Sequence, residues 1–122
     1  MRGFVITTCL FIILILSIVL NYNFVREVHS EMHRLANNIV PNKQAENKKI
    51  IEELYKYWDE NNTLLSVSVS IREIDELSTV LDCLSAANEI GDVLQTAIYK
   101  ERLQNAIDAI MRLEIISIKS II

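Results

Sequence analysis

An unbroken apolar run near the N-terminus constrains this chain more than any other feature of its sequence. Residues 4–20 are almost all apolar, and no charged residue stands between Arg2 and Arg26. A helix rises ~1.5 Å per residue, so this uncharged stretch is long enough to cross a hydrocarbon core of ~30 Å. The remainder of the 122 residues can hold one small domain.

Three other interpretations explain the run less well than a membrane helix does. A cleaved signal peptide ends in small residues, whereas this run ends with the large side chains of Ile18-Val19-Leu20. A lipoprotein leader needs a longer run upstream of its cysteine than the eight residues before Cys9. Gly3-Phe4 is similar to a prepilin cleavage point, but Thr8 stands where pilins usually carry Glu. The sequence therefore predicts a retained signal-anchor helix over residues 1–21.

The charges that flank the run predict its orientation. Lys and Arg are enriched on the cytoplasmic side of membrane helices. Arg2 and the amino terminus lie on one side, while the other flank begins with the uncharged residues 21–25, and Arg26 and Arg34 follow. We expect a single-pass protein of the cell membrane, with the bilayer as a partner, the N-terminus cytoplasmic and the C-terminal domain extracytoplasmic.

The composition favours helices and excludes several classes of protein. Two Gly and one Pro are too few for Gly-rich phosphate loops or serial β-turns. A net charge of -4 argues against a nucleic-acid binder, which needs a basic surface. Cys9 lies in the apolar run and Cys83 in an amphipathic segment, so we expect no disulfide between them. No motif indicates a cofactor.

A juxtamembrane amphipathic helix is expected over residues 22–41. Its apolar positions recur in steps of three and four, and the helix should end at Val40-Pro41-Asn42 because Pro disfavours helix in its predecessor. Two heptads are too few to establish a coiled coil, so the seam could instead pack on the domain that follows. The seam consists of Val25, Val28, Met32, Leu35 and Ile39.

Residues 42–122 predict a small extracytoplasmic bundle of about three antiparallel helices, which makes the whole chain all-α. The helices are expected over residues 43–60, 64–88 and 93–113. We expect Asn61-Asn62-Thr63 to separate the first two, with Thr63 as an N-cap. Gly91-Asp92 should form the second turn, with Asp92 as the cap of the last helix.

Two segments of this domain allow more than one interpretation. Ser66–Ile71 alternates with period two, as strands do, and the apolar C-terminal tail could pair with it. An isolated strand pair is marginal in water, and Val67, Ile71 and Ile74 also fit helix spacing, so helix is the prediction. The tail carries five isoleucines that would form an adhesive patch in water. We expect it to lie along the bundle, held firmly only when a partner is present.

His29 and His33 stand four residues apart on one helix, a spacing that lets two imidazoles share a metal ion. Glu31 lies about 200° around the helix from either histidine, so the order His-Ser-Glu-Met-His is not the zinc-protease pattern. With no third ligand nearby in the sequence, we predict a solvated flank and no metal. No Ser or Cys has a base at motif spacing, so we expect no catalytic site and no enzyme.

Short motifs along the chain resemble an uncharacterised bacterial family, domain-of-unknown-function family 4363. Its members are short proteins with a membrane helix and a helical remainder. This chain departs from the family pattern at Ile71, where a His is frequent, and at Ser120, where an Asn is usual. Our candidate structural and interaction residues lie in the segments that carry the resemblance, and they are Trp58, Ile71, Glu73, Ile74, Asp75, Leu81, Leu84, Gly91, Asp92, Ser117, Ile118 and Ile121.

The resemblance implies the architecture and a multi-spanning membrane protein as partner, and it implies no activity. We therefore expect a non-enzymatic structural or interaction protein of the bacterial envelope, with self-association left open. A phage-type spanin or a sensor ectodomain is the alternative. A spanin favours one long coiled coil, which Pro41, Asn61-Asn62 and Gly91 interrupt here. A sensor would need an output module beyond the few residues that precede the apolar run.

Overall fold

The computed structural model of the chain is all-helical over the residues that it describes, 1–65 and 71–121, with side chains described as far as Arg112. It contains α1 (Arg2–Asn37), α2 (Gln44–Leu65), α3 (Ile71–Glu89) and α4 (Val93–Ile121). The predicted all-α class is confirmed. The choice between helix and strand for residues 66–70 falls outside the described residues, and Ile71 begins α3.

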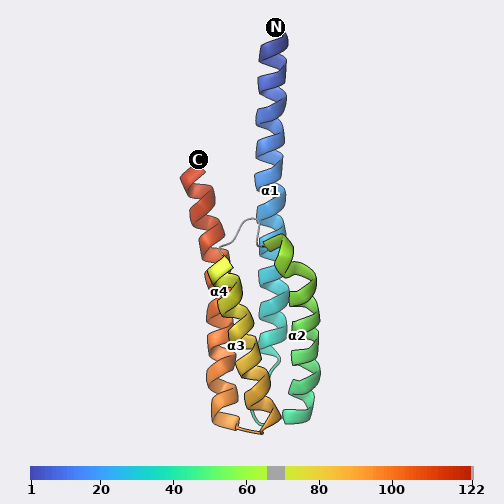
Figure 1. The fold of residues 1–122 in the computed structure, drawn as a ribbon, viewed down its shortest axis with the longest axis vertical. Coiled ribbons are helices and arrows are strands. Elements are labelled where there is room, and N and C mark those ends of the chain that lie inside the picture. Colours follow the sequence, from blue (N-terminus) through green and yellow to red (C-terminus); the bar gives the residue numbers. More distant parts are fainter. Residues whose placement is uncertain (66–70, 122) are drawn as a thin grey trace.

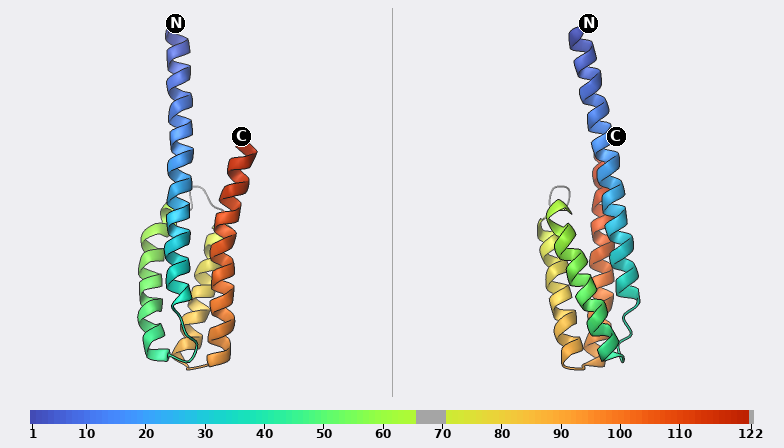
Figure 2. Two further views of the ribbon diagram at one scale, coloured as in Figure 1. Left: turned by 180° about the vertical axis from the view of Figure 1, so that it is seen from behind. Right: turned by 90° about the vertical axis from the view of Figure 1, so that its right-hand side faces the viewer.

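The four helices form an antiparallel bundle in which each helix packs on its neighbour along the chain and α1 packs on α4 (Figure 1). The N-terminal half of α1 projects far beyond α2 and α3. The C-terminal end of α4 also projects beyond them, on the same side (Figure 2). Both chain termini therefore lie at one end of the molecule. The α1–α2 and α3–α4 turns lie at the other end, which we call the turn end.

The predicted seam, which lies on α1 except for Ile39 just beyond the end of that helix, is part of the bundle core. All five of its residues are buried, and they belong to one apolar cluster with residues of α2, α3 and α4. Of the two alternatives for this seam, packing on the following domain is the one observed. Residues 25–39 therefore form one wall of the bundle. The seam residues are Val25, Val28, Met32, Leu35 and Ile39.

The predicted break at Asn61-Asn62-Thr63 is wrong, because α2 continues through it to Leu65. The side-chain amide of Asn61 donates to the Tyr57 carbonyl oxygen at 2.7 Å, within the helix. Leu65 is completely buried, and its packing rewards one further turn of helix. Tertiary packing here overrides the local preference of Asn and Thr for turns. Thr63 is consequently not an N-cap, and α3 begins at Ile71 instead of residue 64.

The predicted turn at Gly91-Asp92 is confirmed. Gly91 has a φ of +73°, in the left-handed region that favours glycine. The Gly91 amide donates to the Asn88 carbonyl and the Asp92 amide to the Ala87 carbonyl, which closes α3 with a Schellman motif. Asp92 then caps α4 by accepting the Gln95 amide at its Oδ1 (3.0 Å). Helix α4 runs to Ile121, past its predicted end at Leu113.

Candidate membrane anchor and interhelical sites

The N-terminal half of α1 is an uncovered apolar helix. It is long and apolar enough to span a membrane: its most apolar stretch has a mean hydropathy of 2.9, and none of that stretch is buried. The first buried side chain along α1 is Val25. One continuous helix thus passes from an exposed apolar surface to a buried seam without a break.

Two polar side chains inside this apolar stretch are satisfied within the helix. The Thr7 hydroxyl donates to the Gly3 carbonyl oxygen at 2.7 Å, and the Thr8 hydroxyl donates to that of Phe4 at 2.8 Å. A polar group in hydrocarbon is costly unless it is hydrogen-bonded, and a helix satisfies its own backbone. These two threonines are therefore compatible with a lipid environment. Large exposed apolar surfaces are rare on soluble monomers and mark sites that contact a membrane or another protein. This half of α1 is such a surface.

Trp58, one of the candidate structural residues, is buried, with 2% of its surface exposed. Its indole Nε1 donates to the Ser78 hydroxyl oxygen at 2.8 Å. The side chain thereby fills the core from α2 and forms a polar link to α3. Its polar atom is used within the bundle, which makes Trp58 a core anchor.

The other predicted residues do not meet in a single site. Ile74, Leu81 and Leu84 are core residues of α3, while Ile71, Glu73 and Asp75 on the same helix remain exposed or half-exposed. Gly91 and Asp92 form the turn described above. Ser117, Ile118 and Ile121 lie on α4, and their side chains fall outside the described residues.

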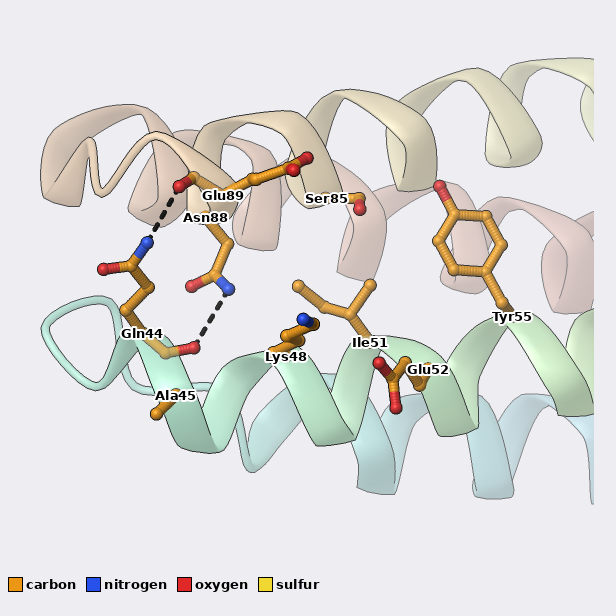
Figure 3. Close-up of a pocket in the computed structure, with 9 residues that line it drawn as sticks. All are labelled: Gln44, Ala45, Lys48, Ile51, Glu52, Tyr55, Ser85, Asn88 and Glu89. Carbon is orange, nitrogen blue, oxygen red and sulfur yellow. Dashed lines mark hydrogen bonds between the residues drawn. The ribbon is translucent and has the colours of Figure 1, made fainter.

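Two buried asparagines that sequence reasoning missed organise the turn end. The Asn47 amide binds both backbone groups of Val40, accepting from its N–H (3.0 Å) and donating to its carbonyl oxygen (2.7 Å). Asn47 also donates to Asn88 Oδ1 (3.2 Å), and Asn88 donates to the Gln44 carbonyl oxygen (3.1 Å). Gln44 in turn donates to the Glu89 carbonyl oxygen at 2.8 Å (Figure 3). This network joins the α1–α2 connection to the end of α3.

An open groove of about 470 Å³ lies between α2 and α3 beside this network (Figure 3). Its walls mix apolar, neutral and charged side chains, and the amides of Gln44 and Asn88 within it already have partners. In the described part of the chain every buried side-chain nitrogen and oxygen has a hydrogen-bond partner. The groove is lined by Gln44, Ala45, Lys48, Ile51, Glu52, Tyr55, Ser85, Asn88 and Glu89.

Tyr55 stands at one end of this groove and donates its hydroxyl to Asp82 Oδ1 at 2.5 Å. Partial burial disfavours the phenolate, and the Asp82 carboxylate, which accepts the hydroxyl proton, disfavours it further. Together they raise the pKa of Tyr55 to about 12. At neutral pH the hydroxyl is therefore a fixed donor that links α2 to α3.

His29 and His33 have a partner on another helix. His29 Nε2 lies 2.8 Å from Asp108 Oδ1 on α4, and His33 Nε2 lies 4.0 Å from the same oxygen. His33 Nδ1 lies 3.0 Å from Asn37 Nδ2. As these side chains stand, no three His, Cys, Asp or Glu residues of the described chain form a ready-made metal centre.

Asp108 was not singled out from the sequence, although its position carried a signal. It adjoins Ile107, which is buried, and it is followed by the buried Ile110, so it stands at the edge of the packed face of α4. The pairing of α4 with α1 brings that edge to the histidines. Asp108 joins the two histidines only through this tertiary contact, which the sequence did not predict.

Comparison with protein-family models, with curated proteins and with solved structures finds no match.

Proposed function

We propose that this chain is a non-enzymatic, membrane-anchored interaction protein of the bacterial cell envelope. The observation that carries the proposal is the uncovered apolar half of α1, which continues without a break into the bundle core. A hydrocarbon bilayer is the environment that suits this half of α1, because the helix is long enough to cross it, carries no charge there and satisfies its threonine hydroxyls internally. The bundle would then stand on the extracytoplasmic side, as the flanking charges indicate.

The position of α4 supports a second contact at the membrane. Its C-terminal end projects beyond α2 and α3 on the side where the apolar half of α1 emerges (Figures 1 and 2). Five of the residues from Ile115 to Ile122 are isoleucine. A helix end of this composition, beside a membrane-spanning helix, suits an integral membrane protein as partner. The antiparallel return of the chain disfavours the spanin alternative, which requires an extended coiled coil.

The anchoring proposal is tested by topology. A phosphatase that folds only outside the cytoplasm, fused after Ile122, should be active, and a fluorescent protein that folds only inside should be dark. Charging the exposed apolar stretch with Ile12→Arg and Leu16→Arg should release the protein from membranes. The matched control is Leu94→Arg, since Leu94 is also exposed and apolar but lies at the turn end. Release by Leu94→Arg alone would contradict the proposal, and the opposite reporter pattern would reverse the orientation.

The partner contact is tested by shortening α4. Removing Ile115–Ile122 should leave membrane insertion and most helix content intact, while lowering the amount of membrane protein that co-purifies. A photo-crosslinker at Ser117 should capture an integral membrane protein. If hydrogen exchange showed this end of α4 as protected as α3 in the isolated chain, the end would be ordinary core, and the partner contact would lose its support.

A further inference from the structure

A cluster of two histidines and one aspartate joins α1 to α4. His29 and His33 stand one turn apart on α1, with ring centroids separated by 5.6 Å. Their Nε2 atoms lie 2.8 Å and 4.0 Å from one oxygen of Asp108. We propose that these three side chains bind a divalent metal ion of the zinc class, which would bridge the two helices. This inference does not depend on the proposed membrane anchoring.

Two of the three donor-to-donor distances in the cluster lie near those found around a bound ion. Zinc holds imidazole nitrogens and carboxylate oxygens at ~2.0–2.2 Å in a tetrahedral arrangement, so two of its donors stand ~3.4 Å apart. The two nitrogen-to-oxygen distances in the cluster lie on either side of this value. A shift of the Asp108 carboxylate from His29 toward His33 would bring both distances closer to this value.

The donor set suits zinc and its neighbours in the first transition series. Two imidazoles and one carboxylate form the protein ligand set of several zinc and iron sites, with water in the remaining position. The carboxylate supplies one negative charge against the ion. The side chains are 26%, 35% and 47% exposed for His29, His33 and Asp108, so an ion can reach them from solvent.

An outer contact is also in place for His33. Its Nδ1 lies 3.0 Å from the Asn37 side-chain amide, which is in turn hydrogen-bonded to Gln104 of α4. Metal ligation through Nε2 requires a proton on Nδ1 and an acceptor facing it. Rotating the Asn37 amide by 180° presents its oxygen to that proton, and Gln104 can turn in the same way to keep its bond. Asn37 would then hold the imidazole in the ligating orientation.

The competing explanation is a plain hydrogen bond between His29 and Asp108 that fastens α1 to α4. That role needs His29 and Asp108 but makes no use of His33, whose Nε2 lies beyond hydrogen-bond distance from Asp108 Oδ1. A metal site needs all three side chains. His33 therefore distinguishes the two explanations.

The test uses the full chain in detergent micelles, stripped of metal with a chelator and titrated with zinc by calorimetry. Cobalt(II) serves as a second probe, since its visible absorption reports tetrahedral coordination. We expect one ion per chain and a rise in the thermal midpoint. His33→Gln and Asp108→Asn should each weaken zinc binding by more than the ~10- to 100-fold that loss of an outer contact costs. Glu101→Gln, which changes an exposed carboxylate on α4, is the matched control and should leave affinity unchanged.

Each other result overturns the proposal. Equal affinity in the wild type and in His33→Gln would leave only the hydrogen bond. Unchanged affinity in Asp108→Asn would mean that α4 contributes no ligand. Thermal midpoints measured in chelator report whether each variant is folded, so a loss of binding without a loss of folding is required.

Discussion

Trp58 contributes a large share of the stability of the bundle, because it fills the core and also links α2 to α3 through Ser78. Trp58→Ala removes the largest fully buried side chain and should lower the free energy of unfolding by ~3–5 kcal/mol. A small domain has only ~5–15 kcal/mol in total. Denaturant unfolding followed by circular dichroism, in detergent, measures the change.

The control for Trp58 is Ser78→Ala, which keeps the indole but removes its acceptor. Leaving a buried N–H without a partner costs ~1–3 kcal/mol, so this variant should be the milder of the two. An unchanged unfolding curve for Trp58→Ala would show that the indole is not a core anchor.

Tyr55 gives the bundle a dependence on alkaline pH. Its pKa is raised to about 12 in the folded chain, first by burial and then by Asp82, whereas an unfolded tyrosine titrates near ~10. The stabilisation from the protonated hydroxyl is therefore complete below the unfolded pKa, and it is lost as pH rises through the folded pKa. The difference in phenolate absorbance between the wild type and Tyr55→Phe should show a single late titration.

Asp82→Asn tests the cause of this shift. The neutral amide no longer repels the phenolate, so the titration of Tyr55 should move toward lower pH. If the difference spectrum of Tyr55→Phe showed an ordinary tyrosine titration, the Tyr55–Asp82 contact would not persist in solution.

At the scale of elements, the turn between α3 and α4 depends on one backbone conformation. A Cβ at Gly91 would meet Gln44 Oε1 at 3.5 Å, an ordinary contact, so space is not limiting there. The φ of +73° is limiting, because a side chain in the left-handed region costs ~1–2 kcal/mol. Gly91→Ala should lower the free energy of unfolding by that amount. Gly91→Asn should cost less, since Asn tolerates this region, and equal costs would contradict the argument.

The elements also show how far the sequence could predict the fold. The seam of α1 and the Gly91-Asp92 turn were predictable, because apolar periodicity and turn chemistry are local properties. The end of α2 was not, because the burial of Leu65 depends on its neighbours in space. The site residues follow the same division. Trp58 is buried at helical spacing from Ile51 and Leu54, which is a local pattern. Asn47, Asn88 and Asp108 instead gain their roles from other helices.

At the scale of the whole molecule, the core begins well inside α1. No residue before Val25 is buried, so a chain lacking residues 2–20 should keep the helix content and thermal midpoint of the bundle in the same detergent. Removing residues 22–41 instead takes out the seam and should abolish cooperative unfolding. Circular dichroism melting of both variants measures the difference. A lower midpoint for the first variant would mean that the apolar half of α1 also supports the bundle.

Because α1 is one unbroken helix, it also fixes the rotational orientation of the bundle relative to the apolar half of α1. Successive residues of a helix are ~100° apart around its axis, so each side of the apolar half points in a set direction relative to the seam. A partner that binds one side of the apolar half of α1 would thereby set the rotational orientation of the bundle about the α1 axis. One residue inserted between Leu20 and Val25 would rotate the bundle by ~100° about the helix axis relative to the apolar half of α1. Seven inserted residues would return the bundle almost to its original orientation. The apolar half of α1 would thus set the orientation of the bundle as well as provide the proposed attachment.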